Sequence, residues 1–362
     1  MEKSSKNILV APLNWGLGHA TRCIPIIKAL EREGYTPIIA SDGAALKMIR
    51  KEFHHLQTLE LPSYQIEYSK KAAFFKWKLI KSSPKMIGAI LKEKKRVAQW
   101  VQEYRLDGII SDNRLGVYNS KIPSVFITHQ LNVLTGNTSW ISSKLHQLII
   151  KKHNECWVPD TEKTPNLSGK LGHLNHDHKL NVKYIGPLSR LQKRNVPKKY
   201  DLVIILSGPE PQRSILENQL QGEVPQFNGK VLFIKGILEE VQKSEVKENV
   251  TYYNYMNASE IEQAFNESDL VLCRSGYTTI MDLAHLEKKA FFIPTPGQYE
   301  QEYLARKLKR EGIAPFAKQD QFSIEKLSEI KLYKGFRNYH TQIDWKELFL
   351  IFKIADKQNG RF

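Results

Sequence analysis

A short glycine-rich segment near the start of the chain, GLGHATR at residues 16–22, combines a conformationally flexible backbone with titratable side chains. It follows the apolar run NILVAPL and opens a pattern of helical periodicity from about His19 to Glu33. Gly16 and Gly18 would let a ligand approach the backbone, and the first N–H groups of a helix attract anions. His19 is the candidate general base because neutral imidazole titrates close to cellular pH. The alternative is a histidine that only caps the helix.

The same segment does not match a dinucleotide-binding loop. That loop has a third glycine, and an acidic residue about twenty positions later holds the ribose. Here the third glycine is missing, and only Asp42 lies near the expected place. The sequence therefore disfavours a dinucleotide site.

Two further segments follow apolar runs in the second half of the chain. In SGPEPQRS, residues 207–214, the prolines indicate a stiff turn into a helix where Arg213 and Ser214 could meet a diphosphate. In RSGYTTIMD, residues 274–282, Ser275 and Gly276 lie where a strand turns into a helix, a geometry that binds anions. Asp282 lies two helical turns further and could accept hydrogen bonds from ribose hydroxyls.

Strands must position these segments, and short β-branched runs alternate with helical patterns along the chain. Strands are expected at residues 7–13, 36–41, 56–62, 107–112, 123–129 and 155–160, and again at 201–208, 230–236, 250–255, 269–276 and 290–295. The first half of the chain ends near residues 182–188. This rhythm predicts two α/β domains, each a parallel sheet covered by helices on both faces. Such sheets bind ligands at the carboxyl ends of their strands, so the cleft between the two sheets is the expected site.

The length of 362 residues also favours two domains, because it exceeds what one hydrophobic core normally holds. The first domain is predicted at residues 1–187 and the second at 201–335. A polar, basic linker is expected at 188–200, and a C-terminal helical segment at 336–362 is expected to return toward the first domain.

The chain resembles the GT-B glycosyltransferases of family 28, with specific motifs mainly in residues 269–305 and a weaker likeness over nearly the whole length. The family includes the bacterial enzymes that add N-acetylglucosamine to the lipid-linked peptidoglycan precursor, and galactolipid synthases are relatives. The resemblance implies two Rossmann-like domains, a UDP-sugar bound to the second domain and a lipid or lipid-linked acceptor bound to the first. The nucleotide-sugar is the substrate, and no cofactor is expected.

The donor-site motifs of the family can be placed on this sequence. An Arg-Ser-Gly turn followed by a ribose-binding acid falls on Arg274, Ser275, Gly276 and Asp282, where the family usually has Glu. Two glutamines that contact the donor sugar fall on Gln301 and Glu302, so the second is altered and the identity of the sugar stays open. The family's diphosphate loop is replaced by SGPEPQR at residues 207–213, which begins with Ser207 and ends with Arg213. Of the family's loop glycines, only Gly208 is retained.

On the acceptor side, the family's glycine loop ends in a histidine that falls on His19, after Gly16 and Gly18. Its motif His-Glu-Gln-Asn resembles HQLN at residues 129–132, where His129 and Asn132 match.

The chain is strongly basic, with 54 Lys and Arg against 38 Asp and Glu and a net charge of +16, so an anionic partner is expected. Between Lys70 and Arg96 ten basic residues and one acid, Glu93, are interleaved with bulky apolar residues. This composition suits an anionic membrane surface, and a docking patch in the first domain is also a family feature. The residues predicted to dock are Lys76, Trp77, Lys78 and Lys81. The alternative is a solvated helix with a buried apolar stripe.

Other classes of function have less support. Cys23, Cys156 and Cys273 form no CxxC pair, so neither a disulfide framework nor a structural zinc site is expected. The cluster of His173, His176, Asp177 and His178 lies in a loop and is read as solvated. The sequence has no Asp-x-Asp motif, so no catalytic metal is expected. No nucleic-acid-binding signature accompanies the basic charge, and nucleic acid is not expected as a partner.

These observations predict a cytoplasmic enzyme, peripheral on the inner face of the cell membrane, that acts in the cell envelope. It would transfer a sugar from a UDP-sugar to an acceptor hydroxyl with inversion, His19 taking the proton. The main alternative is a UDP-sugar hydrolase, because a hydrolase of the pseudaminic acid pathway also has a Gly-x-Gly-His-x-x-Arg loop. In a hydrolase His19 would activate water instead.

Overall fold

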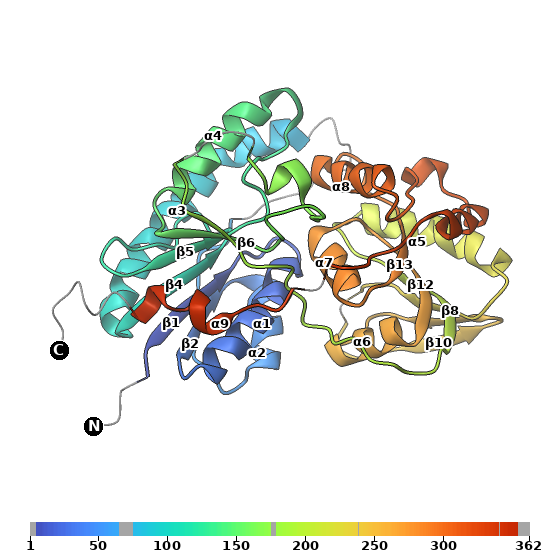
Figure 1. The fold of residues 1–362 in the computed structure, drawn as a ribbon, viewed down its shortest axis with the longest axis horizontal. Helices are drawn as coiled ribbons and strands as arrows, with labels where there is room; N and C mark the ends of the chain where they lie inside the picture. The colour runs from blue at the N-terminus through green and yellow to red at the C-terminus, as the bar shows by residue number, and fades with distance from the viewer. Residues whose placement is uncertain (1–4, 65–74, 175–178, 238, 340, 354–362) are drawn as a thin grey trace. The chain divides into compact units, whose positions relative to one another are not determined.

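The computed structural model describes residues 5–64, 75–174, 179–237, 239–339 and 341–353, with the backbone alone for residues 75–84 and 137. The chain forms two compact units. The first comprises residues 1–67, 76–190 and 341–362, and the second comprises residues 68–75 and 191–340. Each unit is a sheet flanked by helices (Figure 1).

The first unit contains a seven-stranded sheet in the order β3-β2-β1-β4-β5-β6-β7, and all its neighbouring strands are parallel. Its strands are β1 (Asn7–Pro12), β2 (Thr36–Ser41), β3 (Thr58–Glu60), β4 (Leu106–Asp112), β5 (Ser124–Ile127), β6 (Glu155–Val158) and β7 (Val182–Tyr184). The helices of this unit are α1 (Gly18–Arg32), α2 (Gly43–Glu52), α3 (Phe75–Glu103), α4 (Ser139–Ile150) and α9 (Trp345–Leu348).

The centre of this sheet is buried on both faces. Ile8, Leu9, Val10 and Ala11 of β1 are all 0% exposed, as expected for a parallel strand covered by helices on both sides. Helix α1 buries the apolar side that its periodicity predicts, including Cys23, Ile27 and Leu30. The unbroken apolar run of β1 therefore reflects its central place in the sheet.

The end of the chain belongs to the first unit, where α9 is drawn in red in Figure 1. Phe349 and Phe352 are fully buried, and their rings lie against Tyr35 and Trp157. A Cβ atom on Gly108 of β4 would come within 2.3 Å of the Phe352 ring. Glycine at this position is what allows the C-terminal segment to pack against the sheet.

The second unit contains a six-stranded sheet in the order β10-β11-β9-β8-β12-β13. Its strands are β8 (Tyr200–Ile205), β9 (Val231–Ile234), β10 (Ser244–Lys247), β11 (Val250–Tyr253), β12 (Ser268–Cys273) and β13 (Lys289–Phe292). The helices are α5 (Gln212–Glu223), α6 (Ala258–Asn266), α7 (Tyr277–His285) and α8 (Tyr299–Arg310). Four of its five strand pairs are parallel, and β10 is an antiparallel edge strand.

The predicted fold class of two α/β domains with parallel sheets is confirmed. Strands β7 and β10 were not among the expected strands. β7 has only three residues, and all four residues of β10 are exposed, so β10 offers no apolar alternation. In the part of the chain that the structure describes, no helix is both long and apolar enough to cross a bilayer.

Candidate functional site

In the first unit, the predicted glycine-rich segment joins β1 to α1. Gly16 has a φ of +72°, a backbone conformation that a residue with a side chain rarely adopts. Helix α1 begins at Gly18, so His19 lies in its first turn, and Leu17 at the N-cap supplies no side-chain hydrogen bond to the helix. The turn therefore delivers His19 to the carboxyl end of β1, as the sequence predicts.

The centre of this site is a carboxylate that sequence reasoning missed. Asp112, the last residue of β4, is fully buried, and its Oδ2 accepts a 2.5 Å hydrogen bond from Arg22 Nε. Arg22 Nη2 also bonds to Asp112 Oδ1, which lies 2.8 Å from His19 Nδ1. Burial alone would raise the pKa of Asp112, but the charge of Arg22 and the hydrogen bonds to Arg22 and His19 hold that pKa well below its usual range. Asp112 is therefore ionised, and its negative charge lies next to Nδ1 of His19.

The two ring nitrogens of His19 have different surroundings. Its side chain is 14% exposed, and no hydrogen bond to its Nε2 occurs within the described residues. Burial and the charge of Arg22 lower the pKa of His19 from its usual 6.5, and Asp112 only partly opposes them. The imidazole is therefore neutral at neutral pH. His19 Nδ1 lies 2.8 Å from Asp112 Oδ1 and also 2.8 Å from the donor Arg22 Nη2. In the tautomer whose Nδ1–H donates to Asp112, Nε2 keeps the lone pair that accepts a proton.

His129, just beyond the end of β5, joins the same cluster. It is 5% exposed, and its Nδ1 lies 3.1 Å from Arg22 Nη1. Because arginine is only a donor, His129 Nδ1 accepts this bond. Arg22 thus brings together two of the predicted acceptor-side residues, His19 and His129.

Asn132, the other predicted acceptor-side residue, holds a neighbouring loop. Its Nδ2 donates to the carbonyls of Lys170 and His173 at 2.7 and 3.2 Å, and its backbone N–H donates to Leu171. His173 itself faces two backbone carbonyls and stacks on Tyr184 with ring centroids 4.8 Å apart. His176, Asp177 and His178 lie outside the described residues. Among those described, no cluster of three or more His, Cys, Asp or Glu side chains could hold a metal ion.

Asp42, weighed above as a ribose ligand, is engaged in a second buried network of the first unit. Its Oδ1 accepts a 2.7 Å bond from Arg114 Nη1, and Arg114 Nε donates to Glu93 at the same distance. Arg114 and Glu93 are both fully buried. Burial would lower the pKa of Arg114, but these two carboxylates raise it, so the guanidinium stays charged. The lone acid of the basic segment therefore points inward, away from solvent.

In the second unit, two of the predicted donor loops meet at the carboxyl ends of β8 and β13. Gly208 has a φ of +104°, and a Cβ built on it would lie 3.6 Å from Thr295 Oγ1. Thr295 is 2% exposed, and its hydroxyl has no hydrogen-bond partner among the described residues. A buried hydroxyl without a partner costs free energy, so this one is available to a ligand.

Arg274, at the end of β12, carries a buried charge without a carboxylate. It is 1% exposed and donates to the carbonyls of Ile293, Pro294 and Gln212 and to the side chain of Gln319. It forms no ion pair among the described residues, and its Nε is buried without a partner there. Burial lowers the pKa of Arg274 to about 10, so it remains cationic. Its positive field is available to an anion at this sheet edge.

The next two predicted residues form the start of α7. Gly276 is the N-cap of this nine-residue helix, which has no side-chain cap, and a Cβ on Gly276 would meet only open space. Ser275 is fully buried and donates through Oγ to the carbonyl of Gln301 at 2.8 Å. The helix start therefore faces solvent, as an anion site requires. Asp282 lies further along α7 and is half-buried.

Gln301 and Glu302, predicted to contact a donor sugar, support the loop before α8. Gln301 Oε1 accepts from the N–H of Thr295 at 2.8 Å, and Glu302 Oε1 accepts from that of Gly297 at 3.2 Å. Arg213 is bound to Glu210 and Glu217, each at 2.6 Å. All three side chains therefore form hydrogen bonds within the second unit. Their contact with a donor stays a prediction.

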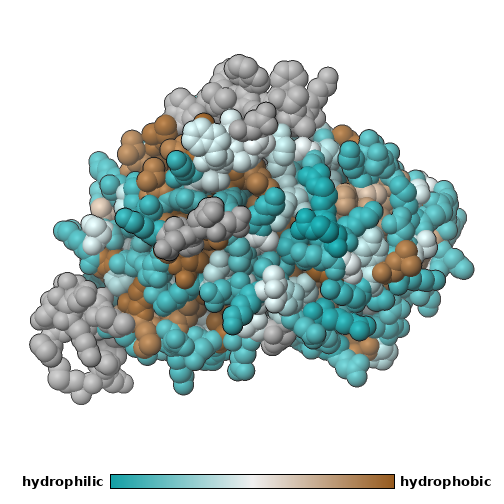
Figure 2. Space-filling view, turned by 45° about the horizontal axis from the view of Figure 1, so that its top comes forward, coloured by the Kyte–Doolittle hydropathy of each residue, from teal (hydrophilic) through white to brown (hydrophobic). Residues whose placement is uncertain are grey.

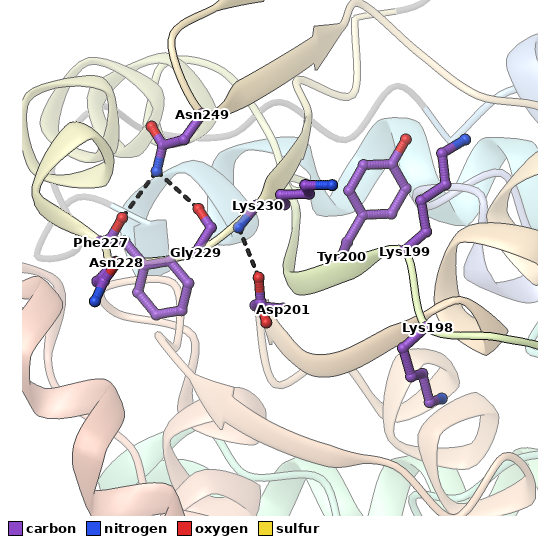
Figure 3. Close-up of a pocket in the computed structure, with 9 residues that line it drawn as sticks. All are labelled: Lys198, Lys199, Tyr200, Asp201, Phe227, Asn228, Gly229, Lys230 and Asn249. Carbon is purple, nitrogen blue, oxygen red and sulfur yellow. Dashed lines mark hydrogen bonds between the residues drawn. The ribbon is translucent and has the colours of Figure 1, made fainter.

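A separate hollow of about 490 Å³ lies at the opposite edge of this sheet, where β8, β9 and β11 begin (Figure 3). Tyr200, Phe227, Lys230 and Asn249 are among its lining residues, and Asn249 Nδ2 donates to the carbonyls of Phe227 and Gly229. It contains none of the predicted site residues. The chemistry described above therefore lies elsewhere.

The chain is similar to several known proteins. Residues 207–346 match the glycosyltransferase family 28 C-terminal domain. Two relatives are named UDP-N-acetylglucosamine–N-acetylmuramyl-(pentapeptide) pyrophosphoryl-undecaprenol N-acetylglucosamine transferase. The protein of Baumannia cicadellinicola is 29% identical over 224 residues, covering 60% of this chain and 58% of the relative. That of Haemophilus ducreyi is 24% identical over 341 residues, covering 90% and 89%.

Solved structures show the same fold across both units. The glycotransferase of kitacinnamycin superposes with a TM-score of 0.60 at 14% identity, covering 98% of this chain and 93% of that one. MurG of Acinetobacter baumannii superposes with a TM-score of 0.53 at 13% identity, covering 97% and 95%. The fold is therefore the GT-B arrangement of two Rossmann-like domains that the sequence predicts.

Proposed function

We propose that this chain, a GT-B glycosyltransferase with a family 28 C-terminal domain, transfers a sugar from a UDP-sugar to a hydroxyl of a lipid or lipid-linked acceptor. The observation that carries the proposal is the pairing of His19 with the buried carboxylate of Asp112 at the start of α1. The names of the two relatives, which specify a UDP-sugar and an undecaprenol-linked substrate, support the donor and acceptor classes.

The proposed reaction is a single displacement. Nε2 of His19 takes the proton of the acceptor hydroxyl while its oxygen forms a bond to the anomeric carbon of the sugar. The bond from that carbon to the diphosphate breaks, UDP leaves with its electron pair, and the configuration inverts. Asp112 holds Nδ1–H of His19 and stabilises the imidazolium that forms, while Arg22 keeps Asp112 ionised.

The donor would be held by the second unit. Its diphosphate would meet the uncapped start of α7, the charge of Arg274 and the unpartnered hydroxyl of Thr295. Asp282 would bind the ribose, and the loop supported by Gln301 and Glu302 would bind the sugar. A nucleotide-sugar supplies both the anion and the hydroxyls that these groups require.

The acceptor class implies work at a membrane surface, on its cytoplasmic face. Lys76, Trp77, Lys78 and Lys81 have side chains outside the described residues. Further along α3, Ile87 and Leu91 are 55% and 62% exposed, and Lys85, Lys92, Lys94 and Lys95 are exposed beside them. With Glu93 buried, the described outer surface of this segment is apolar and basic, which supports attraction to anionic lipid.

The test is a screen for UDP release from a panel of UDP-sugars, with and without a bacterial lipid extract. A transferase should release UDP mainly when lipid is present, and sugar should appear in the lipid fraction. Equal release without lipid, together with free sugar, would replace the transferase by a hydrolase in which His19 activates water.

A further inference from the structure

Arg213, the second residue of α5, is bound by two carboxylates that differ in their exposure to solvent. Its Nη1 donates to Glu217 at 2.6 Å and to the carbonyl of Lys235 at 3.0 Å, and its Nε donates to Glu210 at 2.6 Å. The side chain of Glu217 is 12% exposed, whereas that of Glu210 is 57% exposed. Glu217 and Lys235 therefore hold the guanidinium from inside the unit, and Glu210 binds it on the solvent side.

The carboxylate of Glu210 binds the start of α5 as a phosphate would. Its Oε2 accepts hydrogen bonds from the backbone N–H and the hydroxyl of Ser214, at 3.2 and 2.8 Å, and its Oε1 accepts from Arg213. Burial opposes ionisation, but the hydrogen bonds from Ser214 and Arg213 hold the pKa of Glu210 below its usual 4.5. Glu210 is therefore an anion at neutral pH, bound to the groups that a helix start offers to a phosphate.

Exposure alone does not single out Glu210. In Figure 2 the surface of the second unit is mostly teal, hydrophilic, and an exposed charge is ordinary on such a surface. The simplest alternative is a carboxylate that only caps α5, because the N-cap residue, Pro211, supplies no side-chain hydrogen bond to the helix. The groups around this helix start distinguish a cap from a residue of the donor site.

Two buried groups beside the start of α5 indicate a ligand. Arg274 is 1% exposed and donates through Nη2 to the carbonyl of Gln212, the first residue of α5, while its Nε has no hydrogen-bond partner in the part of the chain that the structure describes. The hydroxyl of Thr295, equally without a described partner, lies 3.6 Å from the position of a Cβ on Gly208, in the loop that leads into α5. A buried cation and a buried hydroxyl therefore adjoin a helix start that the chain's own carboxylate occupies.

We propose that Glu210 is a further residue of the donor site, one that competes with the diphosphate of the donor for Arg213 and Ser214. The inference rests on the proposed function, because a nucleotide-sugar is the ligand that brings the diphosphate. The exposed side chain of Glu210 can turn to solvent, and Arg213 stays in place because Glu217 and Lys235 still hold it. The carboxylate returns when UDP leaves, so the competition lowers the affinity for the product and favours its release.

Calorimetry with UDP, inorganic pyrophosphate and uridine tests the competition in Glu210→Gln, which keeps the size of the side chain and removes its charge. The affinities for UDP and pyrophosphate should rise by about two- to fivefold, the range that corresponds to the loss of one solvent-exposed ion pair. The affinity for uridine, which has no phosphate, should stay unchanged. Glu245→Gln on β10 is the matched control, because its side chain is 55% exposed and it loses the same charge. It should alter none of the three affinities.

Glu217→Gln separates competition from support of Arg213. It removes a charge from the buried side of the same guanidinium, so the affinity for UDP should fall rather than rise. Unchanged or weaker pyrophosphate binding in Glu210→Gln would overturn the inference, as would an equal gain for uridine or no pyrophosphate binding to either protein. The proposed function fails separately: if pyrophosphate binds more tightly to Glu210→Gln but no UDP-sugar releases UDP, the competition stands and the transfer does not.

Discussion

The proposed role of the His19 imidazole as a general base depends on two buried neighbours, Asp112 and Arg22. Substitution of His19 tests this role. His19→Ala should lower kcat by about 10² or more, because no other group replaces the base. UDP affinity, measured by calorimetry, should stay nearly unchanged. His54→Ala, at an exposed histidine of the same unit, is the matched control. Near-normal turnover in His19→Ala would return this residue to a capping role.

The pH dependence of the reaction follows from the lowered pKa of His19. Burial and the charge of Arg22 favour the neutral imidazole, so the base form persists to a lower pH than in a free histidine, whose pKa is 6.5. The midpoint of the acid limb of the kcat/KM profile should therefore lie below pH 6.5. Steady-state kinetics across this range measures the midpoint. An acid limb centred above pH 6.5 would show that a different group is titrating.

Sequence reasoning named His19 and His129 as site residues and Arg22 only as part of the glycine-rich segment, and it did not name the carboxylate that joins them. Asp112 closes a predicted strand, and nothing in local periodicity links it to Arg22, 90 positions earlier in the chain. The available signal was a charged residue at the carboxyl end of a buried strand, since β4 pairs directly with β1. Glu93 was likewise read as part of a charge run, because pairing with Arg114 depends on tertiary packing.

Among the secondary-structure elements, α7 allows a test that separates folding from binding. Gly276 has β-region angles, φ −70° and ψ 139°, and a side chain there would meet only open space. Gly276→Asp should leave Tm unchanged or raise it, because aspartate is a favoured N-cap. The same carboxylate should weaken UDP binding by at least about tenfold through repulsion of the diphosphate. Undiminished UDP affinity would show that the start of α7 does not hold the phosphates.

Further along α7, Asp282 tests the ribose contact. Asp282→Ala should weaken UDP binding by about 1 to 3 kcal/mol, the usual cost of losing a charged hydrogen bond. Asp269→Ala is the control, since Asp269 is exposed at the amino end of β12, at the other edge of the sheet. Calorimetry of UDP binding measures both. Equal affinities of the two variants would remove Asp282 from the site.

For the molecule as a whole, the alternation of apolar runs and helical patterns was enough to predict two parallel sheets. Strands that are buried on both faces appear in the sequence as continuous apolar runs, and β1 and β8 are examples. The exposed edge strand β10 carries no such signal. Contacts such as that of Phe352 with Gly108 join distant parts of the chain, and no local pattern specifies them.

Transfer of a sugar from a UDP-sugar to a lipid can be followed by mass spectrometry of the lipid fraction. The protein would be incubated with the UDP-sugar selected by the screen and a lipid extract, in parallel with His19→Ala. We expect a new lipid species heavier by one sugar residue, formed in step with UDP and with inverted anomeric configuration, and nearly absent with His19→Ala. Sugar recovered only in the aqueous phase, with UDP released at the same rate, would rule out transfer to lipid.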